Sequence, residues 1–325
     1  MTNLSAKNYQ LEERNHCPTC DGVNFKHILT IQDWSIYKCT NCTVLFNNPV
    51  VKNPNDLYQN EAYYEDRTIS FRKAQVFARQ NFPIIGLINR FLLANQSPGK
   101  QPVEFLEIGP GNGGLSLAAK NTGWNVTCAD VSEVVKQKLK ALDLTVELYD
   151  GNVLSFDLSS FDIVAMNHVI EHLKYPRETM ESVARSLKPG GILYLVTPNH
   201  KSLDRYYHAL KWSGWDIPYH LIHFNPKSLS TLLETVGLEV IYVDFTLFNP
   251  LSHIKRGLQA GDLRADIRTP VKAVQPAQTS RDKSPTQVTN NNEVNGKSTF
   301  TPYWKRKIKY YLSERNMIFI ARKRS

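Results

Sequence analysis

Four cysteines fall into two pairs whose spacing is typical of a metal site. The pairs are CPTC at residues 17–20 and CTNC at residues 39–42, and eighteen residues separate them. A CxxC turn presents two thiolates to one ion, and two such turns at the ends of a short hairpin complete a closed tetrahedral zinc site. Four protein ligands leave no open position on the metal, so this zinc would be structural. The alternative is a set of unrelated reduced thiols. The candidate ligands are Cys17, Cys20, Cys39 and Cys42.

A glycine-rich turn follows a short apolar stretch. Residues 103–108 (VEFLEI) are predicted to form a buried strand, and GPGNGG at 109–114 leads into a helical run. Glycines let the backbone approach a nucleotide-type ligand where a Cβ would clash. A second predicted strand, Asn125–Ala129, contains Cys128 as an expected core residue and ends at Asp130, whose carboxylate can accept hydrogen bonds from ribose hydroxyls. The spacing GxGxGG and the lack of a hydride-transfer constellation disfavour a nicotinamide dehydrogenase.

Two histidine-containing segments are candidates for the chemistry itself. NHVIEH at 167–172 directly follows a predicted strand at Phe161–Met166, and WSGWDIPYHLIHF at 212–224 contains His220. A histidine or a carboxylate in such a place can act as a general base. In both segments the alternative is structural, because Glu171 and His172 could brace a loop and His220 could pack among aromatic rings.

The elements that would position these residues alternate along the chain. Such alternation predicts an α/β fold with a parallel sheet, helices on both faces and ligands at the carboxyl ends of the strands. Lys188-Pro-Gly-Gly191 is predicted to stop a helix before the next strand. Further strands are expected at Thr145–Leu148, Ile192–Val196, Leu238–Phe245 and Met317–Arg322, and helices at Arg177–Leu187 and Ser228–Val236.

Several motifs occur together: Glu107-Ile-Gly-Pro-Gly-Asn-Gly113, Asp130, His168-Val-Ile-Glu-His-Leu173, and Leu187-Lys-Pro-Gly-Gly191 followed by Thr197-Pro-Asn199. Their combination resembles class I S-adenosylmethionine (SAM)-dependent methyltransferases. With the stretch from Cys39 to Pro49, the chain is similar to bacterial methyltransferases that carry a zinc ribbon and serve polysaccharide and sugar pathways. The resemblance implies a Rossmann-like seven-stranded sheet with an antiparallel last strand, a small N-terminal zinc-ribbon module, and SAM as cofactor.

The resemblance also assigns cofactor contacts residue by residue. Glu107 would hold the methionyl amine, through the glycine turn or a water, and Asp130 would bind the ribose. At the adenine position relatives show Gly-Asp, whereas this chain has Gly151-Asn152, whose amide can still accept a hydrogen bond but lacks the charge. The expected cofactor-binding residues are Glu107, Gly109, Gly111, Gly113, Asp130, Asn152 and Asn167.

For catalysis the resemblance points to both histidine segments. Quinone-pathway O-methyltransferases have a similar Glu-His pair with an acidic residue in place of His168, and that trio can hold a divalent ion; metal binding here stays open. Zinc-ribbon sugar C-methyltransferases have a similar stretch in which His220 matches a proton-abstracting histidine, although Tyr219 and Ile217 depart from their pattern. The candidate catalytic residues are His168, Glu171, His172 and His220.

Composition limits the partners. The chain has 325 residues, 42% hydrophobic and 21% charged, as in ordinary globular proteins. Residues 246–325 hold 16 of the 39 Lys and Arg residues but 5 of the 30 Asp and Glu residues, so the net charge of +9 belongs to this tail and no nucleic acid partner is expected. The N-terminus has no apolar signal-peptide core and no run suits a spanning helix, so we expect a cytoplasmic protein.

We expect three parts along the chain: a zinc ribbon at 15–50, a helical connection and lid at 51–99, and a SAM-binding methyltransferase domain at 100–325, with a disordered insertion at 269–300. Residues 304–312 (WKRKIKYYL) place an apolar stripe beside a basic face. That segment could pack on the sheet, or it could contact an anionic membrane surface or a diphosphate-linked acceptor.

The expected function is methyl transfer from SAM to a small-molecule acceptor, with a nucleotide- or lipid-linked sugar as the leading candidate. One alternative is a zinc-ribbon RNA methyltransferase, which the nearly neutral core and the lack of a basic, aromatic platform in the ribbon disfavour. The other alternative is a catalytically silent SAM-binding partner protein.

The paired motifs predict one zinc ion per chain. Cys17→Ser or Cys42→Ser removes one thiolate, so the variant should lose zinc and its ribbon should be destabilised, because a module this small has little apolar core of its own. Elemental analysis of protein purified in reducing buffer measures the metal content, with Cys128→Ser as the control that keeps its zinc. Wild-type protein without zinc under these conditions would contradict the prediction.

Overall fold

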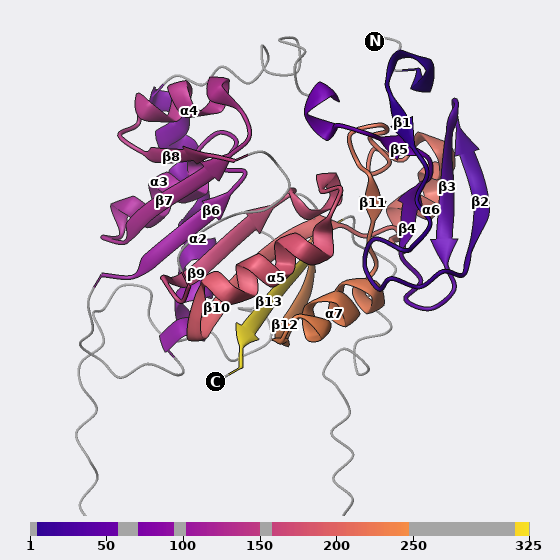
Figure 1. Cartoon of the computed structure of the whole chain (residues 1–325). Coiled ribbons are helices and arrows are strands. Elements are labelled where there is room, and N and C mark those ends of the chain that lie inside the picture. The colour runs from indigo at the N-terminus through magenta and orange to yellow at the C-terminus, as the bar shows by residue number, and fades with distance from the viewer. Residues whose placement is uncertain (1–4, 58–70, 94–101, 150–157, 247–315, 325) are drawn as a thin grey trace, which may run out of the picture.

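The structure is a computed structural model that describes residues 5–57, 71–93, 102–149, 158–246 and 316–324. Asn152, the expected insertion at 269–300 and the basic segment at 304–312 lie outside the described residues. A seven-stranded sheet with helices on both faces forms one part of the molecule, and a smaller sheet stands beside it (Figure 1). None of the helices in the described ranges is both long and apolar enough to cross a membrane.

The large sheet has the strand order β12-β13-β10-β9-β6-β7-β8. β13 is antiparallel to both of its neighbours, and the pairs from β10 to β8 are all parallel. This topology confirms the predicted Rossmann-like methyltransferase sheet with an antiparallel last strand. Its strands are β6 (Glu104–Ile108), β7 (Asn125–Asp130), β8 (Thr145–Leu148), β9 (Phe161–Asn167), β10 (Leu187–Pro198), β12 (Leu238–Thr246) and β13 (Asn316–Lys323).

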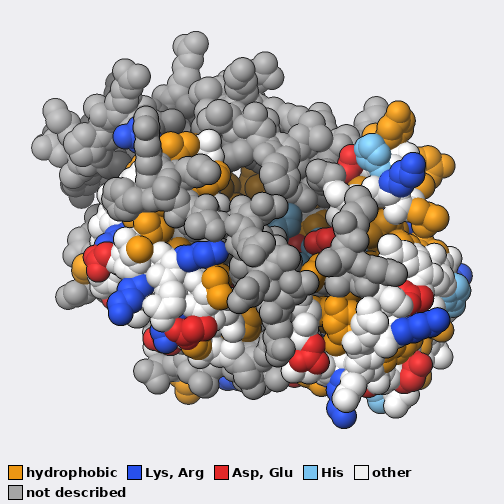
Figure 2. Space-filling model, turned by 90° about the horizontal axis from the view of Figure 1, so that it is seen from above, with side chains coloured by type: hydrophobic (Ala, Val, Ile, Leu, Met, Phe, Trp, Pro, Cys, Tyr) orange, Lys and Arg blue, Asp and Glu red, His pale blue; other side chains and the backbone are white. Residues whose placement is uncertain are grey.

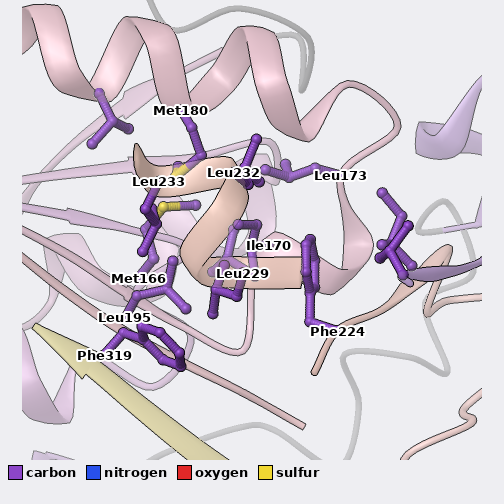
Figure 3. Packing of buried hydrophobic residues seen from close by; sticks show 14 of the residues in the cluster. Met166, Ile170, Leu173, Met180, Leu195, Phe224, Leu229, Leu232, Leu233 and Phe319 are labelled. Carbon is purple, nitrogen blue, oxygen red and sulfur yellow. The ribbon is translucent and has the colours of Figure 1, made fainter. Parts of the chain in front are cut away.

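Two hydrophobic cores lie on the two faces of this sheet, because successive side chains of a strand point to opposite faces. On β10, Leu193 and Leu195 belong to one core, and Tyr194 and Val196 to the other. Figure 3 shows the first core, in which Leu195 and residues of α7 pack over the sheet. The helices are α5 (Pro176–Ser186) and α7 (Pro226–Thr235) on this side, and α2 (Phe71–Leu93), α3 (Gly114–Asn121) and α4 (Glu133–Lys140) on the other.

The segment Lys188-Pro-Gly-Gly191 differs from the prediction. It was expected between a helix and a strand beginning at Ile192, but it lies inside β10, which starts at Leu187. The register against β9 shifts between Leu187 and Ile192, which marks an irregularity in the ladder. Pro and Gly are tolerated in a strand at such a bulge, where a backbone N–H is not needed for pairing. The helix itself ends at Ser186, one residue from the expected position.

The smaller sheet contains the cysteine motifs and a strand from a distant part of the chain. Its order is β11-β4-β3-β2, so that β11, from the region after β10, pairs with β4 of the ribbon. No local pattern indicates this pairing, because β11 is two residues long. The strands are β2 (Phe25–Ile31), β3 (Trp34–Cys39), β4 (Leu45–Asn47) and β11 (Ile222–His223); β1 (Leu11–Glu12) pairs separately with β5 (Val50–Val51).

Short helical segments complete the described chain. η3 (Ile170–His172) follows β9 and contains part of the first histidine segment, and α6 (Leu203–His208) and η4 (Ala209–Lys211) precede the second. The remaining turns, near the N-terminus, are η1 (Ala6–Asn8) and η2 (Pro54–Leu57).

Hydrogen bonds tie the β11 segment to both sides. The fully buried Asn47 donates from its backbone N–H to the carbonyl of Leu221 at 3.0 Å, and from Nδ2 to the carbonyl of His220 at 3.1 Å. The N–H of Leu221 donates to the carbonyl of Glu171 at 2.8 Å. The residues around His220 are therefore held between the ribbon and the loop after β9.

Asn47→Ala is expected to lower the free energy of unfolding by about 1–3 kcal/mol, because it leaves the buried His220 carbonyl without its donor. Chemical denaturation of the full chain measures this difference. Asn53→Ala is the matched control: its Nδ2 also donates a hydrogen bond, to Asp56 at 2.8 Å, but at an exposed position. Equal destabilisation by the two substitutions would show that the Asn47 bridge contributes nothing specific.

Candidate functional site

The two CxxC turns have the same backbone geometry. In each turn, the backbone N–H of the first cysteine donates a hydrogen bond to the carbonyl of the residue five positions later. The backbone N–H of the residue four positions later donates a hydrogen bond to the carbonyl of the first cysteine. Asp21 and Thr43, four residues after the first cysteine of each turn, both adopt the left-handed conformation, with φ of 55° and 67°. The sequence repeat is thus a structural repeat that aims two pairs of sulfurs inward.

The four cysteine sulfurs surround one small space. Cys17 Sγ lies 3.6 Å from Cys42 Sγ, Cys20 Sγ lies 3.6 Å from Cys39 Sγ, and all four lie within 4.8 Å of one another as free thiols. Tetrahedral zinc with Zn–S bonds of about 2.3 Å would place its sulfurs about 3.8 Å apart. The hydrogen bond with Cys42 and burial raise the pKa of Cys17, and burial raises the pKa of Cys20 to about 11. A bound cation would favour the thiolate forms here.

The glycine turn after β6 is formed by three residues in the left-handed region. Gly109, Gly111 and Gly113 have φ of 65°, 52° and 72°, which favours glycine. A Cβ at Gly109 would lie 2.5 Å from Val169 Cγ2, and a Cβ at Gly113 would lie 2.6 Å from Leu139 Cδ2, whereas a Cβ at Gly111 would meet nothing within 4 Å. Two of these glycines therefore permit close packing, and Gly111 faces open space that a ligand can enter.

Two buried carboxylates flank this turn. Glu107 on β6 is 3% exposed and accepts a hydrogen bond from Ser116 Oγ, and Asp130 at the end of β7 is 8% exposed and accepts one from the Ser132 N–H at 2.9 Å. Burial raises the pKa of Glu107 to about 8 and that of Asp130 to about 6. A ligand that brings positive charge and hydrogen-bond donors would offset the cost of burying these negative charges, and it would favour the ionised form of both carboxylates.

A third buried carboxylate, Glu171, lies in η3, directly after the neighbouring strand β9. Its Oε1 is 2.9 Å from His168 Nδ1, and its Oε2 accepts a hydrogen bond from Thr197 Oγ1 at 2.9 Å. Burial alone would raise the pKa of Glu171, but the hydrogen bond from His168 and the attraction of its ring outweigh burial and lower the pKa to about 2. Glu171 is therefore a fixed negative charge among histidines.

The fold brings the two histidine segments into contact, although His172 and His220 are 48 positions apart in the sequence. The rings of His172 and His220 lie 4.6 Å apart, edge to face, and a ligand atom of each lies within 4.8 Å of a Glu171 oxygen. His172 Nδ1 donates to the Tyr219 carbonyl at 3.1 Å, and His220 Nδ1 donates to the Gly214 carbonyl at 2.8 Å. These bonds fix the tautomers in which Nε2 carries the lone pair.

His220 is 7% exposed, and its Nε2 lies 3.8 Å from Asp216 Oδ2. Asp216 has φ of 34° and His168 has φ of 55°, so two non-glycine residues of the site adopt the left-handed conformation. Such a conformation costs about 1–3 kcal/mol per residue, so the packing around each residue must hold it in place. His223 is buried and packs edge-on against Trp215, with their ring centroids 4.8 Å apart.

The two halves of the candidate site touch. β6 pairs with β9 in parallel, with Ile108 opposite Met166, and the contact of Gly109 with Val169 joins the glycine turn to the His168–His172 loop. Asn167 is exposed at the end of β9. Figure 2, which looks down from above the view of Figure 1, shows histidine and acidic side chains at the bottom of a hollow in this face.

Three contributors to the cluster were missed from the sequence: Thr197 on β10, Asn316 on β13, whose Nδ2 lies 3.4 Å from His168 Nε2, and Asn47 of the ribbon. Only Thr197 had a signal, as part of the Thr-Pro-Asn motif. Asn316 and Asn47 reach the site through strand order, which the local sequence does not report.

A family described as "Methyltransferase domain" matches residues 77–243, just over half of the chain. Among curated proteins, the ubiquinone biosynthesis O-methyltransferase of Idiomarina loihiensis is 27% identical over 176 residues, covering 49% of this chain and 71% of that protein. The corresponding protein of Coxiella burnetii is 26% identical, covering 46% and 68%. A probable S-adenosylmethionine-dependent methyltransferase of Mycolicibacterium smegmatis is 31% identical, covering 46% of this chain and 55% of its own length.

Solved structures of similar fold include a SAM-dependent methyltransferase from Archaeoglobus fulgidus, 16% identical with a TM-score of 0.47, covering 81% of this chain and 98% of that one. Another is an S-adenosylmethionine-dependent methyltransferase from Mesorhizobium loti, 15% identical with a TM-score of 0.44, covering 71% and 95%.

The raised pKa of Glu107 predicts a pH-dependent stability. Its folded pKa of about 8 lies above that of an unfolded glutamate, about 4.3, so folding takes up a proton between these values and stability falls as pH rises through this range. Glu107→Gln should abolish this loss, and its stability relative to wild type should rise by up to a few kcal/mol from pH 5 to pH 8. Urea unfolding at several pH values, with the exposed Glu147→Gln as control, measures it. A pH-independent difference would contradict the prediction.

Proposed function

The chain belongs to the methyltransferase domain family, and from this membership we propose that it transfers the methyl group of SAM to an oxygen atom of a small-molecule acceptor. The observation that carries the proposal is the contact between the glycine turn and the loop of Glu171 and His172, which joins a nucleotide-type site to a base cluster. Transfer to oxygen is supported by relatives that are named O-methyltransferases.

The residues around the glycine turn fit SAM. Asp130, at the end of β7, would accept hydrogen bonds from the ribose hydroxyls, and Glu107 would face the cationic methionyl amine; both ionised forms gain from such a ligand. Gly111 leaves room for the cofactor where a side chain would stand. When bound, SAM supplies a methyl group on a positively charged sulfur.

His220 is the group we assign as general base. Its Nδ1–H is held by the Gly214 carbonyl, so Nε2 would be free to take the proton of the acceptor hydroxyl as that oxygen gains the methyl group that bound SAM would release from its sulfur. The imidazolium that forms is stabilised by two carboxylates, Asp216 at 3.8 Å and the ionised Glu171. His168 and Thr197 hold Glu171 in place from the other side.

The ribbon part of the proposal is a structural zinc on the four cysteines. The sulfur spacings support a divalent ion there, and the bound cation would favour the thiolate forms that burial disfavours. The ion would stabilise β3 and β4, and β4 pairs with β11 next to His220. The zinc therefore acts on catalysis through the position of that segment.

The chemical class of the methyl acceptor is the remaining question. The relatives are named for ubiquinone biosynthesis, and the zinc-ribbon motifs resemble sugar-pathway enzymes, so the acceptors to test are hydroxylated quinone precursors and nucleotide- or lipid-linked sugars. Methyl transfer from labelled SAM to each class distinguishes them. Transfer to none of them, by protein that carries zinc and binds SAM, would overturn the proposal.

His220→Ala should lower turnover by about 10²–10⁴ with SAM affinity unchanged, because loss of a general base acts on the chemical step. Asp130→Ala should act on cofactor binding instead. It should weaken SAM binding by about 1–3 kcal/mol, since charge-assisted hydrogen bonds are lost. Turnover with labelled SAM and calorimetric titration of SAM measure the two effects. The exposed His27→Ala serves as control. Near-full turnover of His220→Ala would transfer the base role to Glu171 and His172.

A further inference from the structure

A cluster of positive charge lies where the ribbon meets the segment after β10. It contains Lys26 on β2, Lys38 on β3, Lys201 in the loop before α6, and Arg205 on α6. Lys26 and Lys38 stand directly opposite each other in the antiparallel β2–β3 pair. Like charges in this arrangement repel and destabilise the sheet. Folding alone would not favour these residues here.

This charge is not neutralised by nearby acids. Within the described ranges, none of the four cations forms a salt bridge with a carboxylate. The Arg205 Nε is buried without a hydrogen-bond partner. Partial burial lowers the pKa of Lys201, and repulsion from Lys38 and Arg205 lowers it further. The cluster therefore has donors and positive charge to offer to an anion.

The cluster adjoins an apolar pocket of about 200 Å³, lined by Leu29, Arg205, Tyr206, Ala209, Leu210 and Trp215. Tyr206 is 80% exposed and Leu210 is 59% exposed at its rim, so both are available to a ligand. Arg205 stacks on the Trp215 ring at 5.3 Å and so joins the charged and the aromatic walls. In Figure 2 hydrophobic side chains lie beside basic ones on the right-hand part of the molecule.

Two buried rings, those of Trp215 and His223, separate the pocket from the candidate base. Trp215, which lines it, packs against His223 at 4.8 Å between ring centroids, and His223 lies 6.5 Å from His220. A ligand held in the pocket with its anionic end on the cluster would thus lie within a few side chains of the His220 ring.

We propose that Lys38, Lys201 and Arg205, with Lys26 beside them, bind the phosphate of an organic phosphate whose ring lies in the pocket against Tyr206 and Trp215. Arg and Lys provide the charge-assisted hydrogen bonds that phosphate oxygens accept. The small volume suits one ring, and aromatic side chains suit its face. That this ligand is the methyl acceptor rests on the proposed function; that the cluster binds phosphate does not.

The direct test is calorimetric titration of the full, zinc-loaded chain with pyrophosphate at low salt. Saturable binding is expected, weakened about tenfold or more by Lys201→Ala and by Lys38→Gln, since each removes a charge-assisted hydrogen bond. Lys140→Ala, an exposed lysine on the distant helix α4, is the matched control and should bind like wild type. Unfolding curves of all variants confirm that each is folded.

Two further arms identify the source of the phosphate. Sedimentation with phosphatidylglycerol vesicles, lost in Lys201→Ala and reduced by pyrophosphate, would assign a lipid-linked phosphate; retained pyrophosphate binding without sedimentation would assign a soluble ester. No saturable pyrophosphate binding, or equal binding by Lys201→Ala, Lys38→Gln and Lys140→Ala, would overturn the site. Pyrophosphate binding by protein that fails to bind SAM would overturn the proposed function and leave the site standing.

Discussion

The backbone of Leu221 is held from two directions, and the candidate site depends on this. Its carbonyl accepts a hydrogen bond from Asn47 of the ribbon, and its N–H donates to the carbonyl of Glu171 in the loop after β9. His220 and β11 are therefore fixed between two sheets that share one hydrophobic core, to which Leu221 and Ile222 also belong. Each of these buried backbone groups would cost about 1–3 kcal/mol if left unpaired, so the bridge holds the two parts in one arrangement.

The second constraint is electrostatic. Glu171 is a buried charge, which is costly unless hydrogen bonds and opposite charge compensate it. His168, Thr197 and the nearby rings of His172 and His220 provide that compensation from three elements. At His172 burial outweighs the attraction of this charge and lowers the pKa to about 3, so that ring stays neutral. The left-handed conformations of His168 and Asp216 are tolerated because this packing holds them.

The glycine turn shows how one motif serves packing and binding together. Gly109 and Gly113 are needed because Val169 and Leu139 occupy the space of a Cβ, and Gly111 is the glycine that leaves open space. A motif interpreted as a ligand cradle is thus largely a contact between the turn, α4 and the loop after β9. That contact brings the end of β6 against the residues expected to perform the chemistry.

The sequence alone predicted the α/β sheet and the four-cysteine cluster, because these depend on local signals: strand and helix periods, glycines needing left-handed backbone, and CxxC turns that repeat the same hydrogen bonds. The antiparallel last strand was expected from the resemblance to class I methyltransferases and not from any local signal. It also identified both histidine segments, but it could not join them. The pairing of β4 with a two-residue strand, the contact of His172 with His220, and the approach of Asn316 to His168 were decided by tertiary structure. Such contacts join residues that are far apart in the chain. They depend on a few hydrogen bonds and ring contacts, and contacts of this kind produce no periodic pattern in the sequence.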